Sequence, residues 1–231
     1  MAERKPGSTG DPVQAALADT IYEGLRDEIT DGKLRPGETL SRRGIARRYG
    51  TSSIPVIEAL ARLESTGLVE AEARQAARVR KISLETIQDD YILREAYETQ
   101  AIRLACDAAS VAEIEGLYAM AEAVDACVTA GGTRKAADKT GPRLHWQFHR
   151  GLAKISRCRA LVRELERIEL LRRLQANWYF APEFPDPPRY HSLLVDAVKD
   201  RDPVAADAIM RAHVRNGLEK ELLAYRMRMD P

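Results

Sequence analysis

Apolar side chains recur every three or four residues along most of this chain, which is the spacing of amphipathic helices. From Leu84 onward the pattern is broken by glycine and proline, at Gly131-Gly132, Gly141-Pro142, Pro182 to Pro188 and Asp202-Pro203. No strand pattern intervenes. The breaks predict helices near 84–109, 111–130, 142–155, 158–179, 187–200 and 203–228. We expect these helices to pack as an antiparallel bundle, whose core is a natural place for a ligand cavity.

The segment before this bundle predicts three helices joined by tight turns. One apolar face recurs at helical spacing and ends at Asp31-Gly32; its members are Leu17, Ile21, Leu25 and Ile29. Ser41 is a plausible N-cap for a short helix, Gly50 supplies the next turn, and Ser52 is a candidate cap for the third helix. The expected inward-facing residues of the two later helices are Ile45, Ala46, Tyr49, Val56, Ala59, Leu60 and Leu63. This is a helix-turn-helix layout.

Two short strand-like pieces follow Gly67, around Ala71 to Ala76, and predict a small β-wing. The fold class is therefore mainly α, with a winged helix-turn-helix over residues 13–82. An all-helical domain is expected over residues 83–231. The polar stretch 1–12, rich in Gly, Pro and Lys, is expected to be a disordered tail.

Composition excludes several classes of protein. The chain has 231 residues, enough for two cores, and its 45% hydrophobic and 31% charged content argues against disorder or a membrane protein. Neither a signal peptide nor a run of transmembrane length is apparent, so we expect a cytoplasmic protein without a membrane partner. Three widely spaced cysteines, Cys106, Cys127 and Cys158, suggest neither a disulfide framework nor a thiolate zinc site.

A net charge of +1 gives no global attraction to nucleic acid, so any such binding must come from local charge. Between Ser41 and Gly50 the chain has no acidic residue and four basic ones: Arg42, Arg43, Arg47 and Arg48. This cluster is either a phosphate-binding surface or a solvated helix face.

The N-terminal segment resembles the GntR family of bacterial regulators. The resemblance is carried by Gly32-x-Leu34-x-Pro36-Gly37-x-x-Leu40, then Ala46, Gly50, Ser52, Pro55-Val56, Glu58-Ala59-Leu60, Leu63 and Gly67-Leu68-Val69. It implies that the second helix of the motif enters the DNA major groove and that the wing lies along the backbone. The DNA-contacting residues expected on this basis are Arg42, Arg43, Arg47, Arg48, Ser52, Ser53, Arg74 and Arg78. Ser53 and Ile57 stand where the family usually has arginines, so the operator is expected to be atypical.

Histidine is scarce, and its four copies are placed suggestively. His145 and His149 are four residues apart and share one helix face, whereas His191 and His213 fall on two other predicted helices. A bundle can bring all four imidazoles to one point, where they could bind a metal. The alternative is four structural histidines, hydrogen-bonded in a core or at helix ends.

The C-terminal half resembles the FCD effector domain of the same family, whose metal-binding members use an aspartate and three histidines. His149, His191 and His213 fall on the histidine positions, and His145 falls where the aspartate usually stands. The resemblance thus implies a metal held by His145, His149, His191 and His213. An all-nitrogen donor set suits a divalent transition metal, zinc or nickel above all, better than magnesium or calcium.

Arg94 matches a family arginine that can face the effector cavity. Beside a metal with an open coordination position, a guanidinium would favour a small organic acid. The alternative is an ordinary i,i+4 ion pair with Glu98.

Together these features predict a homodimeric, non-enzymatic transcription regulator, a repressor by family precedent, that binds an operator and responds to a carboxylate effector. Two alternatives stay open. One is a histidine-liganded metalloenzyme, which the absence of HExxH and of an evident general base does not favour. The other is a structural metal in a dimerisation module without an effector.

Overall fold

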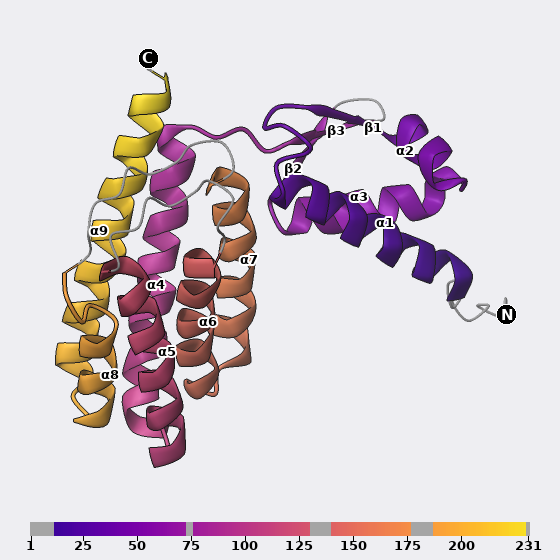
Figure 1. Ribbon diagram of the computed structural model, residues 1–231. Coiled ribbons are helices and arrows are strands. Elements are labelled where there is room, and N and C mark those ends of the chain that lie inside the picture. The colour runs from indigo at the N-terminus through magenta and orange to yellow at the C-terminus, as the bar shows by residue number, and fades with distance from the viewer. Residues whose placement is uncertain (1–11, 73–75, 130–139, 177–186, 230–231) are drawn as a thin grey trace, which may run out of the picture. The chain divides into compact units, whose positions relative to one another are not determined.

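The computed structural model describes residues 12–72, 76–129, 140–176 and 187–229. The chain divides into two compact units, Met1–Lys81 and Ile82–Pro231, which are described separately (Figure 1). Most of the tail expected at 1–12 lies outside the described residues, and the first helix begins at Pro12. Proline is well tolerated at that position, since the first helical N–H has no partner in the helix.

Three helices form the core of the first unit, as the helix-turn-helix pattern predicted. They are α1 (Pro12–Thr30), α2 (Arg42–Tyr49) and α3 (Ser53–Ser65). Ile21, Leu25 and Ile29 of α1 are buried, and α1 packs against α3. The inner face of α3 is also buried, through Pro55, Val56, Ala59, Leu60 and Leu63.

The turns between these helices use the expected residues. Ser41 accepts a hydrogen bond from the Gly44 backbone N–H at 3.3 Å and so caps α2. Gly50 ends α2 in the left-handed conformation, at φ 62°, which costs little without a Cβ atom. Ser52 is the N-cap of α3, but its side chain makes no capping hydrogen bond.

The sheet contains three strands, one more than the sequence indicated. The strands β1 (Thr39–Ser41), β2 (Val69–Glu72) and β3 (Ala76–Val79) are antiparallel in the order β1-β3-β2. β2 and β3 are the wing strands expected after Gly67. β1 was not predicted, because three residues are too few to show strand alternation. It forms by pairing with β3, for example Leu40 with Ala77.

The second unit is a helical bundle, as predicted. Its helices are α4 (Leu84–Ala108), α5 (Val111–Thr129), α6 (Thr140–Ile155), α7 (Arg159–Ala176), α8 (Ser192–Lys199) and α9 (Pro203–Met229). The long helix α4 packs against α6, α7, α8 and α9. α5 packs against α6 and α8. Within the described residues, none of the helices has the length and apolar content to cross a bilayer.

One helix boundary differs from the expectation in a way that shapes the site. A helix was predicted from 187 to 200, but α8 begins at Ser192. Arg189 has a φ of 59°, which an α-helix cannot contain, so the residues just before α8 form a turn. His191 lies at the end of this turn, as the N-cap of α8.

Candidate metal centre and nucleic-acid interface

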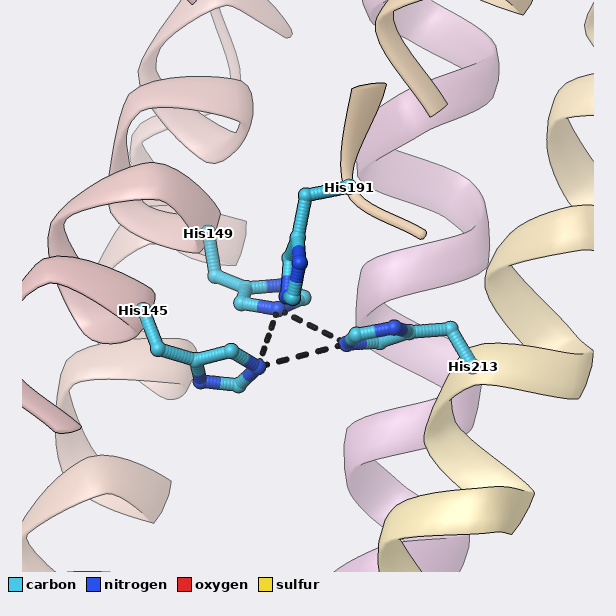
Figure 2. Close-up of side chains that lie close together, drawn as sticks. All are labelled: His145, His149, His191 and His213. Atoms are coloured by element: carbon cyan, nitrogen blue, oxygen red, sulfur yellow. Dashed lines mark hydrogen bonds between the residues drawn. The ribbon is translucent and has the colours of Figure 1, made fainter. Parts of the chain in front are cut away.

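The four histidines converge inside the second unit. His145 and His149 project from α6, His191 from the N-terminal end of α8, and His213 from α9, and all four rings point toward one another (Figure 2). One ligand nitrogen from each lies within 4.8 Å of the other three. The sequence pattern therefore selected four residues that tertiary folding brings to one place.

Three of the ring nitrogens have a spacing that suits a metal. The Nε2 atom of His149 lies 3.2 Å from that of His145 and 3.1 Å from that of His213, and the remaining pair is 3.3 Å apart. A tetrahedral zinc ion with Zn–N bonds of about 2.0–2.1 Å holds its nitrogens roughly 3.3 Å apart. His145, His149 and His213 could therefore hold a metal of this size through their Nε2 atoms.

Two of the imidazoles, those of His145 and His213, are held in the neutral form that a metal requires. Burial lowers the pKa of His145 and of His213 well below the ordinary value, and the neighbouring imidazoles lower both pKa values further. His149, His191 and His213 are all buried. Neutral rings offer lone pairs, whereas protonated rings would repel a cation.

Two carboxylates lie behind the histidines and orient them. Asp125 of α5 accepts hydrogen bonds from the Nδ1 of His191 at 2.8 Å and from its backbone N–H at 3.0 Å. Glu98 of α4 contacts the Nδ1 of His149. A proton on Nδ1 that is held by a carboxylate leaves the lone pair on Nε2, directed at the centre of the cluster.

Both carboxylates stay ionised. Burial alone would raise the pKa of Asp125, but hydrogen bonds from His191 and Ser192 outweigh it and lower that pKa. Burial would likewise raise the pKa of Glu98, but the charge of Arg94 and the hydrogen bonds from His149 and Arg94 outweigh it and lower that pKa far below the usual range. Sequence reasoning missed Asp125, because it is 66 residues from His191 along the chain and no spacing links them.

Arg94 makes the ion pair that the sequence permitted. Its Nε lies 2.5 Å from Glu98, both side chains are buried, and its guanidinium lies 5.3 Å from the ring centre of Tyr91. Because Glu98 also contacts His149, Arg94 is linked to the histidine cluster through a single carboxylate. The ion-pair and cavity interpretations of Arg94 are therefore compatible.

A small cavity adjoins the cluster on the side of α4 and α7. Its polar lining consists of Arg94, Glu98, His145, His149, Glu169 and Arg172. Arg172 is itself paired with Glu169 at 2.8 Å. The cavity volume is about 10 Å³, which is room for about one water molecule. Any larger ligand must displace some of these side chains.

The residues expected to contact DNA differ in their exposure and in whether an acidic side chain already binds them. Arg43, Arg47, Ser52 and Ser53 are exposed, on α2 and at the start of α3. Arg42 is half-buried. Two other arginines are paired with acids: Arg48 binds Glu28 at 2.8 Å, and Arg78 binds Glu72. Arg74 lies outside the described residues.

Both halves of the chain match known protein families. Residues 17–79 match the model for bacterial regulatory proteins of the gntR family, and residues 90–216 match the FCD domain. This chain belongs to the GntR family. The expected resemblance is confirmed in both halves, as is the mainly helical fold with a winged helix-turn-helix and an FCD domain. The GntR/FCD proteins are transcription regulators and not enzymes.

Curated relatives extend over most of the chain. The "Probable D-xylose utilization operon transcriptional repressor" of Paenarthrobacter nicotinovorans is 30% identical over 207 residues, covering 84% of this chain and 86% of its own. The HTH-type transcriptional repressor RspR of Escherichia coli strain K12 is 25% identical over 203 residues, covering 84% of each chain. This GntR-family chain is thus a DNA-binding transcription regulator, similar to proteins described as repressors.

Solved structures share the fold. E. coli McbR/YncC aligns with a TM-score of 0.68 at 20% identity, over 90% of this chain and 98% of its own. A GntR family member from Pseudomonas syringae pv. tomato strain DC3000 aligns with a TM-score of 0.54 at 24% identity, over 95% of this chain and 90% of its own. At these identities the likeness concerns the fold.

Proposed function

We propose that this GntR regulator is a homodimeric, cytoplasmic repressor whose FCD domain holds a divalent transition metal and releases or strengthens operator binding when a small carboxylate binds beside that metal. The observation that carries the proposal is the convergence of four imidazoles next to one buried and one half-buried arginine, Arg94 and Arg172.

The DNA-binding part rests on the exposed basic surface of the first unit. We assign phosphate or base contacts to Arg42, Arg43, Arg47, Arg48, Ser52, Ser53, Arg74 and Arg78. Among the described members, Arg43 and Arg47 are exposed on a helix without an acidic residue. Each phosphate neutralised in this way releases condensed counterions, so binding weakens steeply as salt rises. A homodimer would place two such surfaces on two half-sites of a palindrome.

The metal part rests on His145, His149, His191 and His213. Imidazole nitrogen is a good ligand for zinc and nickel and a poor one for magnesium and calcium, which prefer oxygen. The carboxylates of Asp125 and Glu98 hold two of the rings with their Nε2 atoms inward. A bound metal supplies a positive charge and, where a coordination position stays open, a binding site for an oxygen ligand.

The effector part rests on charge. Four neutral histidines leave the charge of a divalent metal uncompensated by its own ligands. Buried Arg94 and half-buried Arg172 add two cations, each already paired with a glutamate. An incoming carboxylate would compete with Glu98 for Arg94 and expand the small cavity. Because such a ligand rearranges α4 and α7, it can favour one arrangement of the dimer over another, which is the requirement for regulation.

A band-shift experiment with the full-length protein tests the whole proposal. The DNA upstream of the protein's own gene is titrated at moderate salt, with and without chelator and with a series of small carboxylates. We expect a site-selective complex, a metal content near one per chain, and a shift in affinity with one class of acid. Weaker DNA binding by Arg43→Ala, with retained metal, would support the assignment of the two halves. If the protein binds no DNA site selectively, that result would contradict the proposal of a repressor.

The small cavity also favours a second candidate, a structural metal in a dimerisation module. In that case chelation would lower the melting temperature, but no acid would change either the melting temperature or DNA affinity. An effector binds only the folded protein and so raises the melting temperature with concentration. Thermal shift with the same acids therefore separates the two candidates.

A further inference from the structure

The first two turns of α3 expose two isoleucines beside Glu58, which is unexpected for a helix that reads DNA. Among the described residues of the first unit, the exposed large hydrophobic side chains are Val13, Ile54 and Ile57. Two of the three lie on the first two turns of α3. Ile54 is 62% exposed and Ile57 is 45% exposed.

These isoleucines form one stripe. Ile54, Ile57 and Ala61 are spaced i, i+3 and i+7, so they share a helix face, and all three are exposed. The opposite face carries Val56 and Leu60, which are buried against the rest of the unit. The stripe therefore points away from the core of its own domain.

α3 has no side chain free to make a bidentate contact with guanine or adenine. The sequence of α3, SIPVIEALARLES, contains one arginine and no lysine, asparagine or glutamine. That arginine, Arg62, is paired with Asp19 at 2.5 Å and lies 4.3 Å from the ring centre of Tyr22. Bidentate contacts from Arg to guanine or from Asn or Gln to adenine are therefore not available on the helix.

The major groove does present one apolar group, the C5-methyl of thymine. The N-terminal residues of a recognition helix are those that reach base edges, and Ile54 and Ile57 occupy that end of α3. Exposed Arg43 and Arg47 on the neighbouring α2 supply the positive charge that holds a phosphate backbone. The apolar stripe and its basic border thus complement a thymine-rich stretch of duplex.

We propose that Ile54 and Ile57 read the operator by packing on thymine methyl groups, so that hydrophobic contact replaces arginine readout on this helix. This inference rests on the proposed DNA-binding function. It predicts operator half-sites with thymines at the positions that face the first two turns of α3.

Replacing thymine by deoxyuridine tests the contact, because it removes the methyl group and leaves every hydrogen-bonding group of the base in place. Duplexes are first selected from a random library by the full-length protein. Each thymine of the selected site is then replaced by deoxyuridine, one at a time. Burying one methyl group is worth about fourfold in affinity. We expect that loss at one or two thymines per half-site.

Variants of the protein then assign the contact. In Ile54→Ala with Ile57→Ala, deoxyuridine and thymine should bind equally well at those positions. Val13→Ala removes another exposed apolar side chain, from α1, and should keep the fourfold difference. Ile57→Arg should shift the selected base toward guanine.

The outcomes are distinct. Wild-type protein that ignores every deoxyuridine substitution would overturn the inference, and so would a fourfold difference that survives in the double alanine variant. A change of oligomeric mass in that variant, with the deoxyuridine pattern intact, would assign the stripe to a protein interface instead and also overturn the inference. Failure to select any site would contradict the DNA-binding proposal itself.

Discussion

Asp125→Asn is the sharpest test of the proposed metal centre, because Asp125 orients His191 without being one of the four proposed ligands. Its Oδ1 accepts from the backbone N–H and the Nδ1 of His191, and its Oδ2 accepts from the backbone N–H of Ser192 at 3.1 Å and from the Ser192 hydroxyl at 2.7 Å. Asparagine keeps one acceptor oxygen. Its amide group would face the Ser192 N–H, which cannot reverse its role as a donor.

The expected loss follows from this geometry. The variant removes the negative charge that holds the Nδ1 proton of His191 and strengthens donation by Nε2. Loss of such a carboxylate weakens metal binding by about 10- to 100-fold, or roughly 1.4–2.8 kcal/mol. Helical content should stay close to that of the wild type, because the histidines themselves remain.

Zinc competition with a coloured chelator, on full-length protein at pH 7.5, measures the loss. Asp196→Asn is the matched control, since Asp196 binds Tyr118 and Arg189 and is not one of the carboxylates that contact the histidines. It should bind zinc as the wild type does. Equal zinc affinity in Asp125→Asn and wild type would refute the reasoning, as would an equal loss in both variants.

Three further predictions concern the DNA surface, the acid range and the first core. Arg43→Ala should lower the slope of log affinity against log salt by about one, because it removes one phosphate contact. Arg48→Ala should change this slope less, since Glu28 already neutralises Arg48. Equal slopes in the two variants would contradict this expectation. In metal-free protein the pKa values of His145 and His213 are lower in the folded than in the unfolded chain, so at a pH between the folded and unfolded values the unfolded chain binds more protons. The free energy of unfolding therefore falls as pH drops below about 6.5. Thermal melts from pH 7.5 to 5.5 should show a falling melting temperature, and a rising one would be inconsistent with neutral imidazoles. Ile21→Ala should cost about 2–5 kcal/mol of unfolding free energy in urea titration, because Ile21 is fully buried in the first core, while Val13→Ala on the exposed face of α1 should cost little.

The helices were largely predictable because their signals are local. Ser41 and Gly50 set the limits of α2 through a side-chain cap and a left-handed turn, and both depend on residues within four positions. The buried stripe of α3 follows from the same 3.6-residue period. β1 was missed because its three residues gain their hydrogen bonds from β3, which lies more than 30 residues away.

Amino-acid sequence alone determined which residues could form the candidate site: four histidines, two of them one helical turn apart, and an arginine cluster without acids. Only the tertiary structure decided which of these residues lie together and which are paired with other side chains. It brought the Nε2 atoms of His145, His149 and His213 within 3.3 Å of one another. It also placed the carboxylate of Asp125 against the Nδ1 of His191, and it paired Arg48 and Arg78 with acidic side chains. The physical reason is that the 3.6-residue period of a helix fixes which face a side chain lies on. The residue that this side chain contacts belongs to another helix, at a sequence distance that no local pattern records.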